Sequence, residues 1–516
     1  MKNSLIFSAL ILAASVMFAC SDPGDPSYLT LSPEGPIELP AEGNTVTVTV
    51  NTNVAWVAAS SQAWCVVTGG SGSSAGSFTV SATANTSTDA MPAATVTVTA
   101  GEGYDQIVKT INVTQKGAEP EPEPEPLSLS EGGTANCYIL TAAGRYSFDA
   151  TVIGNGADGI VDENFHASTA TIAPVSARLV WQDRWADGEG FISSVELKEG
   201  RVVFEATNKF PAANALIAAC DAAGNIIWSW HIWRPDEKIE PLDIETGYKI
   251  MNMNLGADFN TPATPGSFGM LYQWGRKDPL PAADVLAGTT TTVGKPIYNI
   301  DGGAVAVKNS SWTSGDQNTL AFAIANPTMC LSRYSQGTSG DWLKAGTGVN
   351  ALWGNPQGAI RDEESNYPKG NKSIYDPCPV GWRVPPADVF HKFTSSGGYV
   401  WANTDDTVPN FNVRDTNNDG VLSLDDYNYG WHFMLSATTD SYFPAAARFD
   451  GQYAMLMGSM TGLWGSYWSN AANGDDRGFV PLAFGVKNMS GAKEINATAS
   501  ANAPRADAYS IRCIVE

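Results

Sequence analysis

Thr45-Val46-Thr47-Val48-Thr49-Val50 alternates polar and apolar residues with a period of two. Residues 77–81, 95–99 and 110–114 repeat this alternation, and Gly, Ser and Asn residues separate the segments. Successive side chains of a strand point to opposite faces, so each segment predicts a half-buried strand. Several short strands at this spacing predict a small antiparallel β-sandwich over residues 28–117.

The composition of the whole chain favours a mainly β fold. Of its 516 residues, 50 are Gly and 30 are Pro, and only 16% are charged, well below the roughly 25% typical of soluble proteins. At about 150 residues per domain, the length predicts about three domains. The 53 acidic residues outnumber the 30 basic ones, giving a formal charge of −23. This charge repels a phosphate backbone, so we expect no nucleic-acid partner.

A stiff linker follows the first sandwich. Residues 118–126 contain four Glu-Pro pairs in succession. Proline fixes φ and the glutamates repel one another, which predicts an extended spacer of about 25 Å at roughly 3.1 Å per residue. Residues 127–240 then predict a second β-sandwich module, in which an apolar strand at 215–220 and a turn at 221–225 lead into an aromatic strand at 226–233.

The first sandwich carries tryptophans at the ends of predicted strands. Trp56 and Trp64-Cys65, together with Val113-Thr114-Gln115 at the end of the last strand, form a pattern that resembles the BACON domain. The resemblance implies an immunoglobulin-like sandwich of the kind found in Bacteroidetes surface proteins, acting in carbohydrate binding or as a spacer. Trp56 and Trp64 are therefore candidate sugar-stacking residues. Large aromatics also dominate small cores, so core packing is the alternative.

The aromatic strand of the second module offers another candidate ligand surface. Alternation places Trp228 and Trp230 on one face of this strand, with His231 and Trp233 on the other. We consider the three tryptophans as candidate ligand-binding residues. The alternative is a packed interface with the domain that follows.

Five short motifs succeed one another in residues 241–516. They occupy residues 252–257, 271–279, 375–385, 467–470 and 509–513. Their order resembles the Fibrobacter succinogenes major paralogous domain, a relative of the C-type-lectin and formylglycine-generating-enzyme fold. The resemblance implies a mixed α+β, C-type-lectin-like head whose last strand returns beside the early part of the domain. It therefore also implies a disulfide between Cys378 and Cys513.

The resemblance does not carry enzyme chemistry over to this chain. Formylglycine-generating enzymes use a reactive cysteine pair with copper. Here the cysteine pair sits in motifs that look structural, and no nearby histidine activates either thiol. The four histidines also form no HExxH motif. We therefore expect no enzymatic activity.

The head contains a sequence that fits a calcium loop. Asp415-Thr416-Asn417-Asn418-Asp419-Gly420-Val421-Leu422-Ser423-Leu424-Asp425-Asp426 matches the twelve positions of an EF-hand loop. The predicted Ca²⁺ ligands are Asp415, Asn417, Asp419, Val421, Ser423 and Asp426. Asp at the last position is shorter than the usual Glu and resembles dockerin-type loops, which implies weaker or geometrically tighter binding. We predict a structural calcium ion, and an acidic surface loop is the alternative.

The N-terminus has the pattern of an exported lipoprotein. In residues 1–19 a lysine precedes an apolar run, and the small residue Ala19 precedes Cys20. This resembles a bacterial lipobox, which implies a lipid anchor on Cys20 followed by a tether at residues 20–27. Acidic residues in this tether resemble the surface-export signal of Bacteroidetes lipoproteins. We expect an outer-membrane lipoprotein exposed at the cell surface; the alternatives are a signal peptide cut for simple secretion and a buried helix.

These features together predict a surface-anchored, non-catalytic binding protein. Its lectin-like head would contact a glycan or a surface protein. The alternative is a structural role, as an accessory or tip subunit of a surface fibre. An exposed strand edge or a donor strand in the first two modules would favour that alternative.

Overall fold

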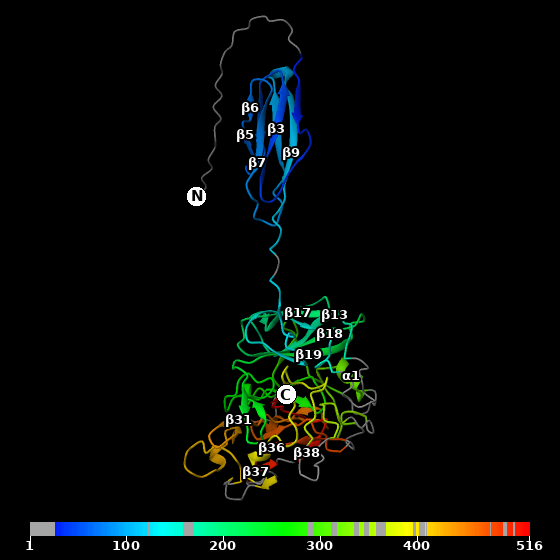
Figure 1. Cartoon of the computed structure of the whole chain (residues 1–516), viewed down its shortest axis with the longest axis vertical. Coiled ribbons are helices and arrows are strands. Elements are labelled where there is room, and N and C mark those ends of the chain that lie inside the picture. The colour runs from blue at the N-terminus through cyan, green and yellow to red at the C-terminus, as the bar shows by residue number, and fades with distance from the viewer. Residues whose placement is uncertain are drawn as a thin grey trace. The chain divides into compact units, whose positions relative to one another are not determined.

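The computed structural model describes residues 26–121, 124–157, 170–286, 294–310, 317–334, 340–344, 350–357, 368–395, 399–401, 408, 410–474, 476–488, 493–498 and 501–516. The chain divides into two compact units, Met1–Pro124 and Glu125–Glu516, and the division falls inside the Glu-Pro segment (Figure 1). The predicted signal peptide, Cys20, the tether up to Asp25, and spacer residues 122–123 lie outside the described residues. No helix within these ranges is long and apolar enough to cross a membrane.

The first unit is the predicted β-sandwich. One sheet has the strand order β1 (Leu29–Ser32), β3 (Asn44–Thr52), β7 (Gly76–Ala82) and β5 (Val66–Thr68). The other has the order β2 (Ile37–Leu39), β9 (Ile107–Gln115), β8 (Ala94–Ala100), β4 (Trp56–Ser60) and β6 (Ser71–Gly72). The alternating segments form β3, β7, β8 and β9. Along β8 every second residue from Ala94 to Ala100 is buried, so the period of two fills the core from one face of the strand.

The second unit begins with two further sheets. The smaller sheet has the order β10 (Leu127–Ser128), β12 (Gly144–Asp149), β17 (Arg201–Ala206) and β16 (Ile192–Lys198). The larger has the order β11 (Cys137–Ile139), β19 (Ile226–Arg234), β18 (Ala213–Cys220), β13 (Ser176–Gln182), β24 (Ile297–Tyr298) and β25 (Ala304–Val305). The two sheets pack face to face, because the ring of Phe148 on β12 lies 5.0 Å from the ring of Trp230 on β19.

The second module and the head share one hydrophobic core. The larger sheet takes β24 and β25 from beyond residue 240. One buried cluster runs from Cys137 to Cys513 and includes side chains on both sides of the predicted boundary at 240/241. In Figure 1 the strands β18 and β19 of the larger sheet accordingly lie next to the head. Residues 125–516 therefore fold as one compact unit.

The head itself is built from short strands. Its sheets include β20 (Pro241–Asp243), β21 (Lys249–Met251), β40 (Ile514–Val515) and β28 (Trp382–Arg383), in that order. A second sheet has the order β23 (Leu280–Pro281), β22 (Met270–Gln273), β39 (Ala508–Tyr509), β32 (Phe449–Asp450) and β33 (Met455–Leu456). A third has the order β29 (Tyr399–Trp401), β37 (Lys493–Thr498), β36 (Leu482–Asn488) and β34 (Trp464–Tyr467).

Pairs of strands complete the head. They are β26 (Lys308–Asn309) with β27 (Met329–Cys330), β30 (Gly430–Met434) with β31 (Asp440–Pro444), and β35 (Arg477–Val480) with β38 (Ala501–Pro504). Across the described residues the α-helical structure is the six-residue α1 (Leu320–Ala325). The mainly β fold is thus confirmed, while the C-type-lectin-like character of the head stays a prediction.

Candidate functional site: a buried seam and two surface clefts

The two candidate tryptophans of the first unit differ in burial. Trp56 is only 3% exposed, its ring centre lies 5.8 Å from that of Phe78, and its Nε1 donates to the carbonyl oxygen of Ser74 at 2.9 Å. Sugar stacking by Trp56 is therefore a wrong prediction, because both ring faces lie in the core. Trp64 is half-buried and donates through Nε1 to the carbonyl oxygen of Pro92, so it stays a candidate.

The three tryptophans of β19 do not form a ligand surface. Trp228, Trp230 and Trp233 are each 2% exposed or less. The Nζ of Lys277 lies 4.6 Å from the ring centre of Trp228, and the Nε1 of Trp233 donates to the carbonyl oxygen of Ala257 in the head. The ligand-binding prediction is wrong for all three, and the packed interface is what the structure contains.

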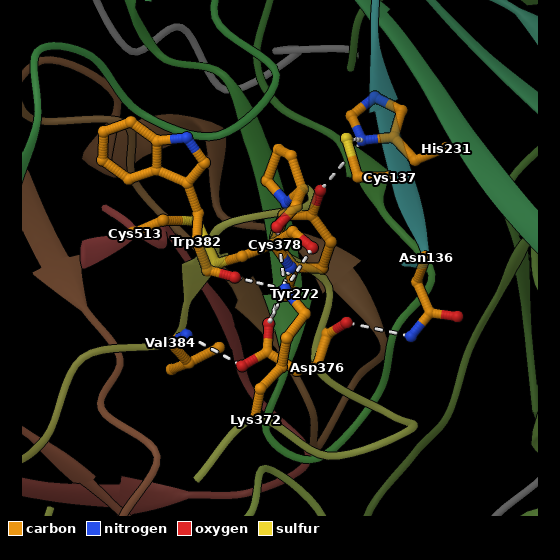
Figure 2. Close-up of a disulfide and its surroundings, with 11 residues drawn as sticks. Asn136, Cys137, His231, Tyr272, Lys372, Asp376, Cys378, Trp382, Val384 and Cys513 are labelled. Carbon is orange, nitrogen blue, oxygen red and sulfur yellow. Dashed lines mark hydrogen bonds and ion pairs between the residues drawn. A yellow bond between two sulfur atoms is a disulfide. The ribbon is translucent and has the colours of Figure 1, made fainter. Parts of the chain in front are cut away.

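Lys372 and Asp376 shape the loop that carries Cys378 (Figure 2). The two oxygens of Asp376 accept hydrogen bonds from the backbone N–H of Cys378 and of Val384, each at 2.8 Å. The Nζ of Lys372 lies 3.8 Å from Oδ1 of Asp376 and donates to the carbonyl oxygens of Cys378, Pro379 and Trp382. Both side chains are buried. Burial lowers the pKa of Lys372 and raises that of Asp376, while each charge opposes the shift of the other.

The disulfide expected from the resemblance is confirmed. Cys378 and Cys513 are bonded, with their Cα atoms 6.2 Å apart (Figure 2). Cys513 directly precedes β40, which pairs with β21 at Ile250 and with β28 at Arg383. The last strand therefore returns beside the start of the head, and the disulfide fixes it there.

Asn136 joins the second module to the same loop. Its Nδ2 donates to the carbonyl oxygens of Ile374 and Asp376 at 2.7 and 2.9 Å. Its Oδ1 accepts a hydrogen bond from Nε1 of Trp228 at 2.9 Å. The motifs around Asn136 and Trp228 thus dock onto the Cys378 loop, and we call this contact the seam. The buried amide of Asn136 thus has hydrogen-bond partners for both its nitrogen and its oxygen, which is what a buried polar group requires.

The seam contains a cysteine, histidine and asparagine in the order of a catalytic triad. The Sγ of Cys137 lies 3.6 Å from Nδ1 of His231 (Figure 2), and Nε2 of His231 lies 2.9 Å from Oδ1 of Asn214. Tyr272 also reaches Nδ1 through its hydroxyl, at 3.3 Å. Strand pairing makes this arrangement, because Cys137 on β11 lies opposite His231 on β19. No pattern in the sequence marks it, because the three residues share no motif.

The environment of this triad opposes nucleophilic chemistry. Burial raises the pKa of Cys137 far above its usual value and lowers that of His231 to about 3. The Nδ2 of Asn214 donates to Asp183 at 3.0 Å, so its Oδ1 accepts from His231, and Nδ1 of the histidine is the acceptor. A neutral thiol beside a neutral imidazole holds no thiolate nucleophile.

The predicted calcium loop has an ordered, acid-lined shape. Oδ2 of Asp415 accepts from the backbone N–H of Gly420 at 2.8 Å, and Asp419 accepts from that of Val421 at 2.7 Å. Asp426 is buried and accepts from the N–H groups of Ser423 and Thr416. The other oxygen of Asp415 is buried without a hydrogen-bond partner. No three His, Cys, Asp or Glu side chains in the described ranges gather closely enough to hold a metal unaided, so calcium stays a prediction.

A surface cleft of about 500 Å³ opens where the larger sheet of the second unit meets the head. Its walls come from β23, β24, β25, β32 and β33. Apolar side chains dominate, including Val305, Phe449 and Met455, and Met455 is 51% exposed. This size lies within the range of roughly 300–1,000 Å³ typical of small-molecule sites.

A second cleft, of about 480 Å³, is lined in part by the same chain segment. Residues 305 and 306 line both clefts. The second cleft is more polar, with Arg178, Lys308, Asn299 and Thr328 among its lining residues. No pattern in the sequence marks either cleft, because the lining residues come from segments far apart in the sequence, several of them two-residue strands and turns.

The family comparison bears on the first unit. Residues 54–116 match the model of the BACON family, whose description is "Putative binding domain, N-terminal". The match confirms the BACON domain predicted from Trp56, Trp64 and the strand pattern. No curated protein matches the chain.

Several solved structures resemble part of the chain at low identity. The Bacteroides ovatus GH5 xyloglucanase in complex with an XXXG heptasaccharide is 19% identical with a TM-score of 0.17, over 26% of this chain and 30% of that chain. The YadV chaperone is 13% identical with a TM-score of 0.15, over 40% and 98%. The titin domains Z1Z2 in complex with telethonin are 13% identical with a TM-score of 0.17, over 40% and 94%. TM-scores this low carry no argument about function.

Proposed function

We propose that this protein is a non-catalytic binding protein, held at the cell surface by a lipid on Cys20 in the outer membrane, with a glycan as its ligand. The observation that carries the proposal is the pair of clefts that share residues 305 and 306 in their linings. Apolar surface beside polar donors is what a sugar needs, because its ring faces stack on apolar groups while its hydroxyls take hydrogen bonds.

The state of the reactive groups supports binding over catalysis. Cys378 and Cys513 are bonded to each other. Cys137 and His231 are buried, and burial raises the pKa of the thiol and lowers the pKa of the imidazole, so both side chains are neutral near pH 7. The groups that resemble enzyme chemistry thus stabilise the seam, whereas the clefts lie at the surface.

The N-terminal quarter of the chain supports presentation of the second unit. A BACON domain at residues 54–116 precedes the Glu-Pro segment where the two units divide. A lipid anchor, a binding-type domain and a stiff spacer together hold a second unit away from a membrane.

We also propose that the loop at residues 415–426 holds a structural Ca²⁺. The ion would take oxygens from Asp415, Asn417, Asp419, Val421, Ser423 and Asp426. The buried Oδ1 of Asp415 without a hydrogen-bond partner is the observation that favours an ion here. A bound ion would stabilise the fold of this loop.

A glycan array probed with the full-length protein, in calcium and again in EDTA, tests the proposed function. We expect binding to a defined class of glycans. Loss of binding in EDTA would mean that the calcium loop supports the clefts. A blank array in both conditions would contradict a glycan ligand, and a pull-down would then test a surface protein as the partner.

A further inference from the structure

The second cleft concentrates positive charge in an acidic protein. Arg178 and Lys308 line it, and no Asp or Glu is among its described lining residues. The first cleft likewise has Lys295 and no described carboxylate in its lining. The chain as a whole carries 53 acidic against 30 basic residues, so this local excess of cations reverses the overall balance.

The cations of the two clefts differ in whether they have a partner within the described structure. In the first cleft, Lys295 forms an ion pair with Asp258 at 3.3 Å. Among the residues that the structure describes, the side chains of Arg178 and Lys308 form neither an ion pair nor a hydrogen bond, and both residues are exposed. Their donors are therefore available to a ligand.

Neutral polar groups complete the second cleft. Oδ1 of Asn299 accepts from the N–H groups of Asp301 and Gly303 at 3.0 and 2.7 Å, which leaves its Nδ2 as a donor. Thr328, whose side chain carries a hydroxyl, lines the same cleft. A guanidinium, an ammonium, an amide N–H and a hydroxyl around about 480 Å³ are donors suited to an anion that also carries hydroxyl groups.

We propose that the second cleft selects an acidic sugar, one whose carboxylate or sulfate group is bound by Arg178 and Lys308. This inference rests on the proposed glycan ligand and specifies that the glycan is negatively charged. The apolar cleft beyond residues 305–306 would then contact neighbouring units of the same chain of sugars. Charge-assisted hydrogen bonds of this kind change affinity by roughly ten- to a hundredfold each.

The experiment is a set of matched titrations of the full-length protein. Polygalacturonate is compared with its methyl ester, and dextran sulfate with dextran, which separates carboxylate from sulfate as the source of charge. We expect at least tenfold tighter binding to one acidic polymer than to its neutral partner, and weaker binding in high salt. Arg178→Gln and Lys308→Gln should each reduce that affinity about tenfold or more. The control Lys198→Gln removes an exposed cation of β16 that lines neither cleft and should leave it unchanged.

Each other outcome overturns the inference. Equal binding to charged and neutral polymers would reject it while leaving the proposed glycan function intact. If the Arg178→Gln, Lys308→Gln double variant binds an acidic polymer as tightly as the wild type does, the inference is also rejected and the proposed glycan function stays intact. Failure to bind these polymers or any glycan on the array would reject both proposals.

Discussion

Removing the disulfide should strongly destabilise the second unit. Cys378 and Cys513 are 135 residues apart in sequence, so the bond closes a long loop and restricts the unfolded chain. In the loop-entropy description a loop of this length is worth about 5 kcal/mol at 25 °C. At roughly 2.1 cal/mol/K per residue for the unfolding entropy of residues 125–516, that loss corresponds to a fall in Tm of about 6 °C.

The assay is urea or thermal unfolding of the Cys378→Ala, Cys513→Ala double variant. Its matched control is the Cys220→Ala, Cys330→Ala double variant, because these two cysteines are also buried but are not bonded to each other. The control therefore removes two buried sulfur atoms, as the test variant does, but removes no crosslink. Titration of thiols in denaturant should also detect Cys378 and Cys513 only after reduction. A double variant no less stable than its control, or reactive Cys378 and Cys513 before reduction, would refute the reasoning.

Three further outcomes follow from the buried charges and the acidic loop. His231 has a pKa of about 3 when folded against about 6.5 unfolded, so only the unfolded state gains its proton as the pH falls. The free energy of unfolding should therefore drop by about 2 kcal/mol from pH 7 to pH 5. In His231→Gln, chemical denaturation should show a free energy of unfolding that depends less steeply on pH, and an unchanged pH dependence would count against this. Asp376→Asn removes the carboxylate that pairs with the buried Lys372 and should cost about 3–5 kcal/mol of unfolding free energy. A urea midpoint close to wild type would contradict this prediction. Calcium at a hundredfold excess over its Kd should raise the free energy of unfolding by roughly 2.7 kcal/mol. Measured by calorimetry, this stabilisation should be absent from the Asp415→Asn, Asp419→Asn variant and present in the control Asp425→Asn. Equal stabilisation of both variants would reject the loop as the calcium site.

The first unit was predictable because its information is local. Alternation along residues 45–50 and 95–99 assigns each side chain to a face before any partner strand is known, and the structure places these segments in β3 and β8. The disulfide could also be expected, but only from the resemblance, since spacing alone does not pair cysteines.

The sites of the second unit were less accessible to sequence reasoning. Whether an aromatic strand faces solvent or a neighbouring domain depends on what packs against it. The sequence pattern therefore allows a ligand face at Trp228 and Trp230, although both are buried. Strands of two residues such as β24 and β25 carry no periodicity, yet they extend the larger sheet and line the clefts. The approach of Cys137 to His231 likewise depends on strand register.

Binding of a glycan in the two clefts is tested most directly by filling the clefts with a larger side chain. Ala306 is exposed and lines both clefts, so Ala306→Trp places a large ring at their shared edge. Ala222→Trp adds the same ring on the exposed turn between β18 and β19 and serves as the control. With both variants as stable as wild type, the account predicts that Ala306→Trp loses binding to the glycan class found on the array while Ala222→Trp retains it. Undiminished binding by Ala306→Trp would contradict the account.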